Sequence, residues 1–275
     1  MQRSGRSYCR ISKMIVAWAV FLQFGASQTP AGDFDLYLAL EDYQWQEFVH
    51  GSRLLEESGF LYGLGFVYST ELDDHLTLRP AAEIFGGTVD YEGQTVTRLA
   101  ASTDTNYFGV KVECDLGRRY RSGRNLVIEP FGGLGLRAWT RDLEDTTLSD
   151  GTPASGYPED WVSLYGRLGL RGSGELSAQK RFFAQAGVKA PLYNRMTAYQ
   201  SEIGGQDLTF HPGKQPSFFA EAGVRTERFT GSIFYEGIRF EQSESIITIE
   251  GLEEFENFQP ESRADLYGVK LGVAF

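Results

Sequence analysis

Cysteine and long apolar runs are what this sequence of 275 residues most lacks. Its two cysteines are Cys9 and Cys114, and no stretch of 18 consecutive apolar residues occurs along the chain. A transmembrane helix needs about 20 predominantly apolar residues, so the sequence predicts none. If Cys9 is removed with an N-terminal leader, Cys114 stands alone and we expect no internal disulfide bond.

Basic charge is also scarce, and part of it lies at the N-terminus. Residues 1–27 contain four basic and no acidic side chains, then the apolar run MIVAWAVFLQFGA and the small residues GAS. This order predicts a secretory signal peptide, 1–27, that is cleaved after Ser27. The remaining 28–275 has 22 basic and 37 acidic residues, a net charge of −15, which argues against nucleic acid as a partner.

The sequence is rich in glycine, with 32 residues, and in aromatic residues, at 14%. Much of the chain alternates apolar with polar or small residues at a period of two, in segments that mostly reach the ~9–11 residues of a tilted transmembrane strand. The alternating segments are 33–48, 59–71, 75–91, 106–118, 125–140, 161–175, 180–192, 217–227, 229–241 and 263–275.

The connections between these segments alternate between short and long. The long ones are 49–58, 92–105, 141–160, 193–216 and 242–262. Short periplasmic turns and long external loops in alternation are typical of outer-membrane barrels. We therefore expect 28–275 to form an all-β, transmembrane, antiparallel up-and-down β-barrel of about ten strands, with eight or twelve strands as alternatives.

Each expected strand has an apolar face and a face that contains charged residues. Near the middle of a bilayer an unpaired charge is costly, so the charged faces must point into the barrel. The predicted lumen charges are Glu41, Arg79, Glu83, Lys111, Glu113, Asp115, Glu129, Arg137, Arg167, Arg171, Lys189, Glu221, Arg225 and Lys270. Both signs are present, so we expect ion pairs to cross the lumen and to leave at most a narrow, ion-sized path. Gly133 falls on the same face, where we expect Gly133→Ser to cost far less than a new lysine on the outer face, as in Val110→Lys or Ala222→Lys.

One expected strand does not fit this division. The segment 229–241 has apolar residues on both faces, and Glu236 shares a face with Phe234, Ile238 and Phe240. Its register therefore stays open.

The final segment, LYGVKLGVAF, alternates bulky apolar residues up to the aromatic Phe275. In this pattern, and in the stretch EPFGGLGLR at 129–137, the chain resembles the small bacterial outer-membrane β-barrel proteins over the whole of 28–275. In that family such an ending is the signal that the assembly machinery reads, although Lys270 stands where glycine is frequent. The matching residues are Tyr267, Val269, Leu271, Val273 and Phe275.

The resemblance implies location in the bacterial outer membrane, with its lipids and its assembly machinery as partners. The residues favour a non-enzymatic role, either structural or as a narrow channel, and predict no cofactor, metal site or catalytic group. One alternative is a rim protease of the omptin type, with Asp90, Glu92 and His211 as its acid pair and histidine, or another outer-membrane enzyme. Another is an adhesin or binding protein that uses the long external loops.

Overall fold

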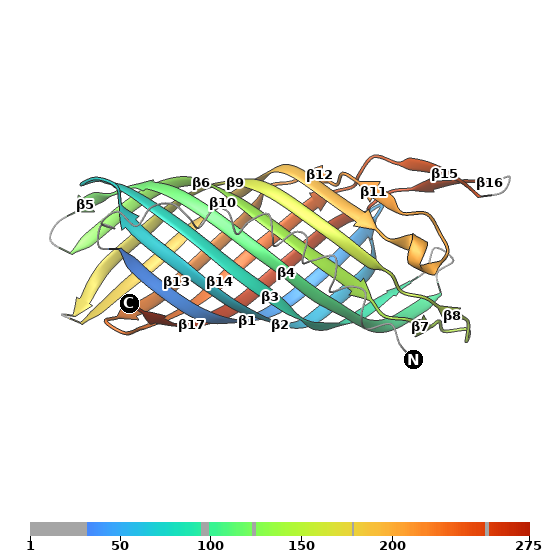
Figure 1. Cartoon of the computed structure of the whole chain (residues 1–275), viewed down its shortest axis with the longest axis horizontal. Helices are drawn as coiled ribbons and strands as arrows, with labels where there is room; N and C mark the ends of the chain where they lie inside the picture. The colour runs from blue at the N-terminus through green and yellow to red at the C-terminus, as the bar shows by residue number, and fades with distance from the viewer. Residues whose placement is uncertain (1–31, 95–98, 123–124, 178, 251–252) are drawn as a thin grey trace. The chain divides into compact units, whose positions relative to one another are not determined.

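The computed structural model describes residues 32–94, 99–122, 125–177, 179–250 and 253–275, and the expected signal peptide lies outside the described residues. In this part of the chain ten long antiparallel strands form a closed barrel (Figure 1). They are β1 (Asp33–Val49), β2 (Ser52–Glu71), β3 (Leu76–Gln94), β4 (Ala100–Arg118), β6 (Leu126–Leu143), β9 (Pro158–Ser177), β10 (Lys180–Ala198), β13 (Ser217–Thr226), β14 (Phe229–Glu241) and β17 (Glu261–Ala274).

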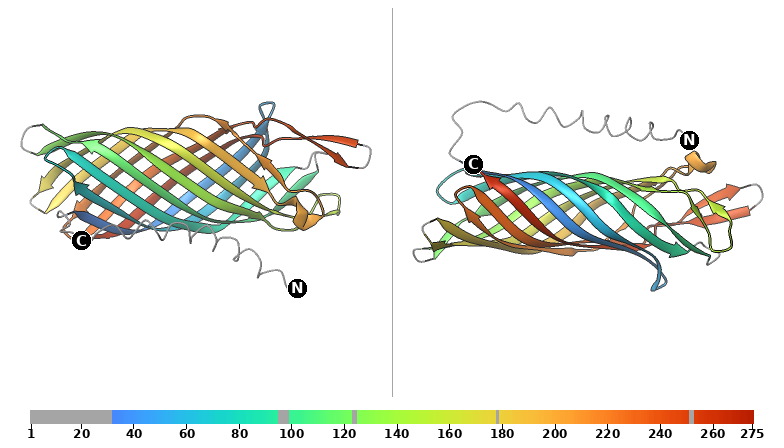
Figure 2. Two further views of the ribbon diagram at one scale, coloured as in Figure 1. Left: turned by 45° about the horizontal axis from the view of Figure 1, so that its top comes forward. Right: turned by 90° about the horizontal axis from the view of Figure 1, so that it is seen from below.

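Each long strand pairs with the next one along the chain, and β17 returns to pair with β1. Figure 2 shows this seam, with β17 in red beside β1 in blue. Closure leaves every long strand with two neighbours, so backbone hydrogen bonds are satisfied all the way round. The predicted fold class and strand number are confirmed.

The connections gather at two ends of the barrel, which we call the loop end and the turn end. The turn end lies where β2 leads to β3, β4 to β6, β9 to β10 and β13 to β14. The loop end lies where β1 leads to β2, β3 to β4, β6 to β9, β10 to β13 and β14 to β17. Short elements lie in these connections. They are β5 (Tyr120–Ser122), β7 (Thr146–Thr147), β8 (Pro153–Ala154), the 3-10 helix η2 (Gln200–Ile203), β11 (Leu208–Phe210), β12 (Gly213–Lys214), β15 (Ile246–Glu250) and β16 (Glu253–Asn257). No helix in the described part of the chain is long and apolar enough to cross a membrane.

The first loop-end connection is much shorter than the sequence predicted. β1 continues to Val49 and β2 begins at Ser52, so that only His50 and Gly51 form the turn. Both residues have positive φ, 50° and 79°, as a two-residue hairpin turn requires. The strand escaped prediction because both of its faces are polar here: Glu57 faces the lumen and Ser58 faces outward beyond the apolar surface.

An apolar belt surrounds the outer wall of the barrel. Large exposed apolar side chains such as Leu38, Leu168 and Leu271 alternate with buried residues on every long strand. β2 has 20 residues, which at about 3.3 Å per residue and a tilt of about 45° gives a height near 45 Å, more than the ~30 Å of a hydrocarbon core. The polar loop-end part of the wall therefore extends beyond the belt.

The register of β14 is settled by its two neighbours. Glu236 pairs with Phe219 of β13 and with Leu266 of β17, and it is 7% exposed. Phe234, Ile238 and Phe240 are buried with it. The lumen face of β14 is therefore mainly apolar with a single carboxylate, which explains why alternation alone did not distinguish it.

Candidate functional site

The lumen is the candidate functional site, because the structure directs all fourteen predicted lumen charges into it. Eight of them are buried and the other six are half-buried and line cavities inside the barrel. Along each strand they occupy every second position, so they stack in layers from the turn end to the loop end. Each layer has a different chemistry.

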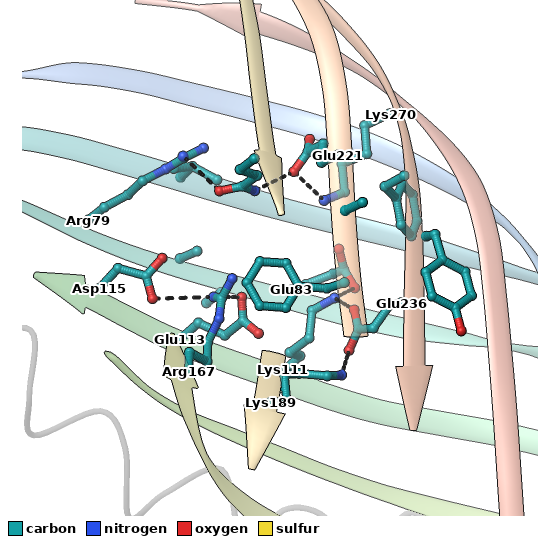
Figure 3. A pocket seen from close by; sticks show the side chains of 18 of the residues that line it. Arg79, Glu83, Lys111, Glu113, Asp115, Arg167, Lys189, Glu221, Glu236 and Lys270 are labelled. Carbon is teal, nitrogen blue, oxygen red and sulfur yellow. Dashed lines mark hydrogen bonds and ion pairs between the residues drawn. The ribbon is translucent and has the colours of Figure 1, made fainter. Parts of the chain in front are cut away.

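The central cluster consists of Glu41, Glu83, Lys111, Arg137, Lys189 and Glu236, all buried. Glu236 is its hub: its carboxylate accepts from Lys111 Nζ at 3.0 Å and from Lys189 Nζ at 2.7 Å, and lies 3.4 Å from Arg137 Nη1. Lys111 also lies 3.1 Å from Glu83. Since Glu236 is on β14 and Lys111 on β4, these pairs cross the lumen (Figure 3).

Glu41 differs from the other members of the central cluster. It is fully buried, and neither of its carboxylate oxygens has a hydrogen-bond partner. It still lies within the electrostatic reach of Lys111 and Arg137. Counting it, the central cluster holds three acids and three bases and is balanced in formal charge.

The turn-side pairs lie between the central cluster and the turn end. Arg167 is paired with Glu113 and lies 3.5 Å from Asp115, while Arg171 lies 3.2 Å from Asp115 and pairs with Glu129. Lys270 and Glu221 are 3.6 Å apart. Figure 3 shows that these two side chains lie side by side. Cavities of about 60 and 140 Å³ adjoin these pairs. The turn side therefore has room for a few waters but not for a wide channel.

The aromatic layer, formed by Trp45, Trp139, Trp161 and Phe240, lies on the loop-end side of the central cluster. Along β1 the lumen positions run Glu41, Tyr43, Trp45, and along β6 Arg137 is followed by Trp139. The ring centroids of Trp161 lie 5.2 Å from Trp45, 5.5 Å from Trp139 and 5.2 Å from Phe240. All four side chains are at most 5% exposed, so this layer fills the lumen.

The loop-end cluster is the next layer and consists of Arg141, Glu47, Glu57 and Glu159, all buried. Arg141 lies 2.5 Å from Glu57, 2.8 Å from Glu159 and 3.5 Å from Glu47. Neutral donors complete it: the indole nitrogen of Trp45 donates to Glu47 and that of Trp161 to Glu159, both at 3.0 Å. Thr105 and Tyr107 donate to Glu57.

The sequence prediction missed the loop-end cluster. It placed Glu57, Arg141 and Glu159 in loops, and it did not include Glu47 among the lumen charges. The signal was present, since Glu47 has the parity of Glu41 and Arg141 has the parity of Arg137. Continuing the alternation beyond the apolar belt would have found both. The belt ends below them, so the outward residues there are polar and the contrast between faces disappears.

A cavity of about 890 Å³ lies at the loop end, on the far side of this cluster from the aromatic layer. Glu47, Arg141 and Glu159 form part of its lining. Its apolar lining includes Leu55, Met196, Leu208, Phe210, Tyr91 and Tyr157. The rest of the lining is mixed, because polar side chains such as Arg53, Gln200 and Glu256 also contribute to it.

The structure does not assemble the expected protease residues. Asp90 and Glu92 are exposed on the outer face of β3, because side chains alternate along a strand and the preceding residue, Val89, points inward. His211 is exposed, and its Nδ1 lies 3.1 Å from the backbone oxygen of Asn194. Among the described residues, no group of three or more histidine, cysteine or acidic side chains is arranged to hold a metal ion.

Comparison with known proteins shows the fold. No family model and no curated protein matches the sequence. The outer-membrane protease OmpT of Escherichia coli superposes with a TM-score of 0.57 at 10% identity, over 91% of this chain and 98% of that one. The chain has the fold of an outer-membrane β-barrel.

Other outer-membrane barrels match with lower scores. The translocator domain of the autotransporter NalP from Neisseria meningitidis has a TM-score of 0.47 at 14% identity, over 96% of this chain and 95% of that one. Ail of Yersinia pestis has a TM-score of 0.34 at 8% identity, over 89% of this chain and 99% of that one.

Proposed function

We propose that this protein lies in the bacterial outer membrane as a non-enzymatic barrel whose lumen is closed to solutes, so that it is a structural element or at most a narrow path for small ions. The observation that carries this proposal is the aromatic layer resting on the balanced central cluster. Together they occupy the lumen at mid-height with buried side chains from opposite walls.

The stability of that closure follows from its charges. Lys111, Lys189 and Glu236 are on three different strands, and each is less than 10% exposed. Removing one of the two lysines leaves Glu236 with fewer donors and the central cluster one charge out of balance, which costs about 1–3 kcal/mol. A solute would have to break these pairs and displace the indoles of the aromatic layer, so we expect permeation to be slow.

Conductance in planar bilayers tests the proposal. We expect the full chain to show no large, steady, porin-like current. Arg137→Ala combined with Trp161→Ala should raise the current, because it removes one side chain from each closing layer. Arg225→Ala is the matched control, since Arg225 pairs with Asp35 at 2.9 Å near the turn end and belongs to neither layer. A large current from the unaltered barrel would refute the closed lumen.

Location and assembly form a separate part of the proposal. The apolar belt and the inward charges support residence in a bilayer, with outer-membrane lipids around the belt. Phe275 completes the seam: it donates its backbone N–H to Phe34 at 2.8 Å, and the two rings lie 5.9 Å apart. We propose that the assembly machinery recognises β17 together with Phe275, which follows it. The residues read would be Tyr267, Val269, Leu271, Val273 and Phe275.

Cell fractionation tests this part. The mature chain, beginning after Ser27, should be recovered in the outer membrane, and deletion of Phe275 should slow its appearance there. Mature protein that stays soluble in the periplasm would contradict the location, and unchanged assembly kinetics would contradict the role of the ending.

The two alternatives fare differently. Likeness to OmpT shows the fold alone, and the outward positions of Asp90 and Glu92 give a rim protease no support. A binding role at the loop end is supported by the cavity of about 890 Å³ and its charged lining.

A further inference from the structure

We propose that the loop-end cavity binds a small organic cation, with ammonium groups on an apolar chain, and that the loop-end cluster supplies the opposite charge. This site goes beyond the proposed function, because it is separated from the turn side by the aromatic layer and does not depend on whether the lumen conducts. Three independent observations support it: the charge of the cluster, the oxygens it leaves unused and the walls of the cavity.

The charge of the loop-end cluster is unbalanced. One guanidinium, Arg141, faces three carboxylates that are 5%, 0% and 4% exposed. The formal charge of this buried group is therefore −2, whereas the central cluster sums to zero. Uncompensated charges in such surroundings are costly unless a counter-charge is supplied. A cation in the adjoining cavity supplies it.

Two of the carboxylates have an oxygen to offer. In the described part of the chain, the contacts of Glu47 with Trp45 and Arg141 use Oε1, and those of Glu159 with Trp161 and Arg141 use Oε2. This leaves Glu47 Oε2 and Glu159 Oε1 for a ligand. Both side chains are more than nine-tenths buried and both line the cavity, whereas Glu57 is already bonded through both oxygens.

The remaining walls select an organic ligand over a bare metal ion. Met196, Leu208 and Phe210 are at most 5% exposed and form apolar lining. Hard divalent ions prefer six or more oxygen ligands, and no group of three or more histidine, cysteine or acidic side chains among the described residues is arranged to hold a metal ion. An alkyl chain gains apolar contact here, and the rings of Tyr91 and Tyr157 can face an ammonium group. A cavity of about 890 Å³ is within the usual range for small-molecule sites.

The surroundings of the cavity also favour cations. Glu144 and Glu202 are exposed in the loop-end connections, and Glu256 is part of the cavity lining, whereas Arg53 in the same lining is already paired with Glu56. Acidic side chains at the entrance of a cleft raise the local concentration of cations and their association rate, most strongly at low salt.

Titration calorimetry on the full chain in detergent tests the proposal, with 1,6-diaminohexane as probe and 1,6-hexanediol as its neutral counterpart. We expect saturable binding of the diamine at pH 7, with the diol at least about tenfold weaker. Glu47→Gln and Glu159→Gln should each weaken diamine binding about tenfold or more, because each removes a charge but keeps the shape. Asp90→Asn is the matched control: it removes one acid at the same end, on the outer wall, and should change the affinity less than about twofold.

Several results would overturn the proposal. They are absence of saturable diamine binding to the unaltered barrel, equal affinity for the diol, an equal loss in the Asp90→Asn control, and displacement of the diamine by an equal concentration of Mg²⁺. Heat-dependent gel mobility establishes that each variant is folded. If a variant does not assemble, the diamine and diol comparison on the unaltered barrel decides. None of these results depends on conductance, so this inference and the closed lumen can fail separately.

Discussion

The central cluster and the loop-end cluster are both buried groups of acidic and basic side chains, and they share strands β1 and β6. They differ in the ratio of acids to bases. The central cluster combines three acids with two lysines and one arginine. The loop-end cluster has three acids around Arg141 alone and draws on the neutral donors Trp45, Trp161, Tyr107 and Thr105. The first is complete in itself and closes the lumen. The second retains negative charge beside a cavity.

The difference shows that two equally buried groups of charges in one lumen can serve different purposes, depending on whether their charges cancel. In the central cluster, the carboxylates keep other cationic partners when one cation is removed. In the loop-end cluster, removal of Arg141 leaves all three carboxylates without a cation. The largest expected effect on stability therefore lies in the loop-end cluster, although the central cluster holds more charges.

Removing Arg141 should have the largest effect. Arg141→Met leaves three buried carboxylates without a cation and should lower the free energy of unfolding by about 3–5 kcal/mol. Lys189→Met is the comparison, because Glu236 keeps Lys111 and Arg137, and we expect a loss of about 1–3 kcal/mol. Urea unfolding of the refolded barrel in lipid vesicles measures both. Equal losses would remove the distinction between the two clusters.

A new charge on the outer wall should have a smaller effect. Ala222 is exposed in the apolar belt, and Ala222→Lys should cost about 2–4 kcal/mol if it lies near the middle of the bilayer. Gln185→Glu places a new charge in the lumen, where Arg171 donates to the Gln185 side chain at 3.1 and 3.2 Å. The substitution loses the hydrogen bond from Gln185 to Glu221 at 2.8 Å, but Arg171 on one side and Lys270 beside Glu221 on the other oppose the added charge. We expect it to cost clearly less in the same unfolding assay. If the lumen charge cost as much as the outer one, the assignment of one face to lipid and the other to a polar lumen would be contradicted.

The smallest of the three effects concerns the neutral donors. Trp161→Phe keeps a ring in the aromatic layer but removes the hydrogen bond to Glu159, at an expected cost of about 1–3 kcal/mol. The same substitution at Trp45, which donates to Glu47, should have a similar effect. Unchanged stability in both variants would show that Arg141 alone satisfies the loop-end cluster.

Strand positions and lumen parity could be predicted from the sequence wherever lipid lies on one side of the wall. There the alternation of Val110 with Lys111, or of Ala222 with Glu221, distinguishes the face toward lipid from the face toward the polar lumen. Above the apolar belt both faces are polar, so Glu57 and Arg141 were assigned to loops. In β14 both faces are largely apolar, and only pairing with β13 and β17 settled that Glu236 points inward.

How closely side chains pack inside the lumen could also not be predicted from the sequence. Gly133 faces the lumen, but a side chain there would meet Asp115 Oδ1 and the backbone oxygen of Cys114, each 2.4 Å from the Cβ position. A serine at Gly133 therefore requires Asp115 and the backbone at Cys114 to move, a packing cost that the alternation does not predict. Alternation reports which way a residue points, whereas the space in front of it depends on partners from other strands.

The seam between β1 and β17 has a kinetic consequence. Its fourteen residue pairs join segments that are more than 200 residues apart, from Asp35 with Ala274 to Phe48 with Glu261. Contacts of such sequence separation form late, because the chain entropy of closing the whole circle must be lost before they are gained.

Contacts of Asp35 inside the lumen also depend on closure of the seam between β1 and β17. Asp35 accepts hydrogen bonds from Arg225 at 2.9 Å and from Thr230 at 3.1 Å, residues that are 190 and 195 positions away in the sequence. Closure of the wall and completion of the interior near the turn end are thus one cooperative step. Until that step, β1 and β17 each have one edge without a hydrogen-bonded neighbour. The rate at which these two edges meet sets how long they remain available for pairing with strands of other chains.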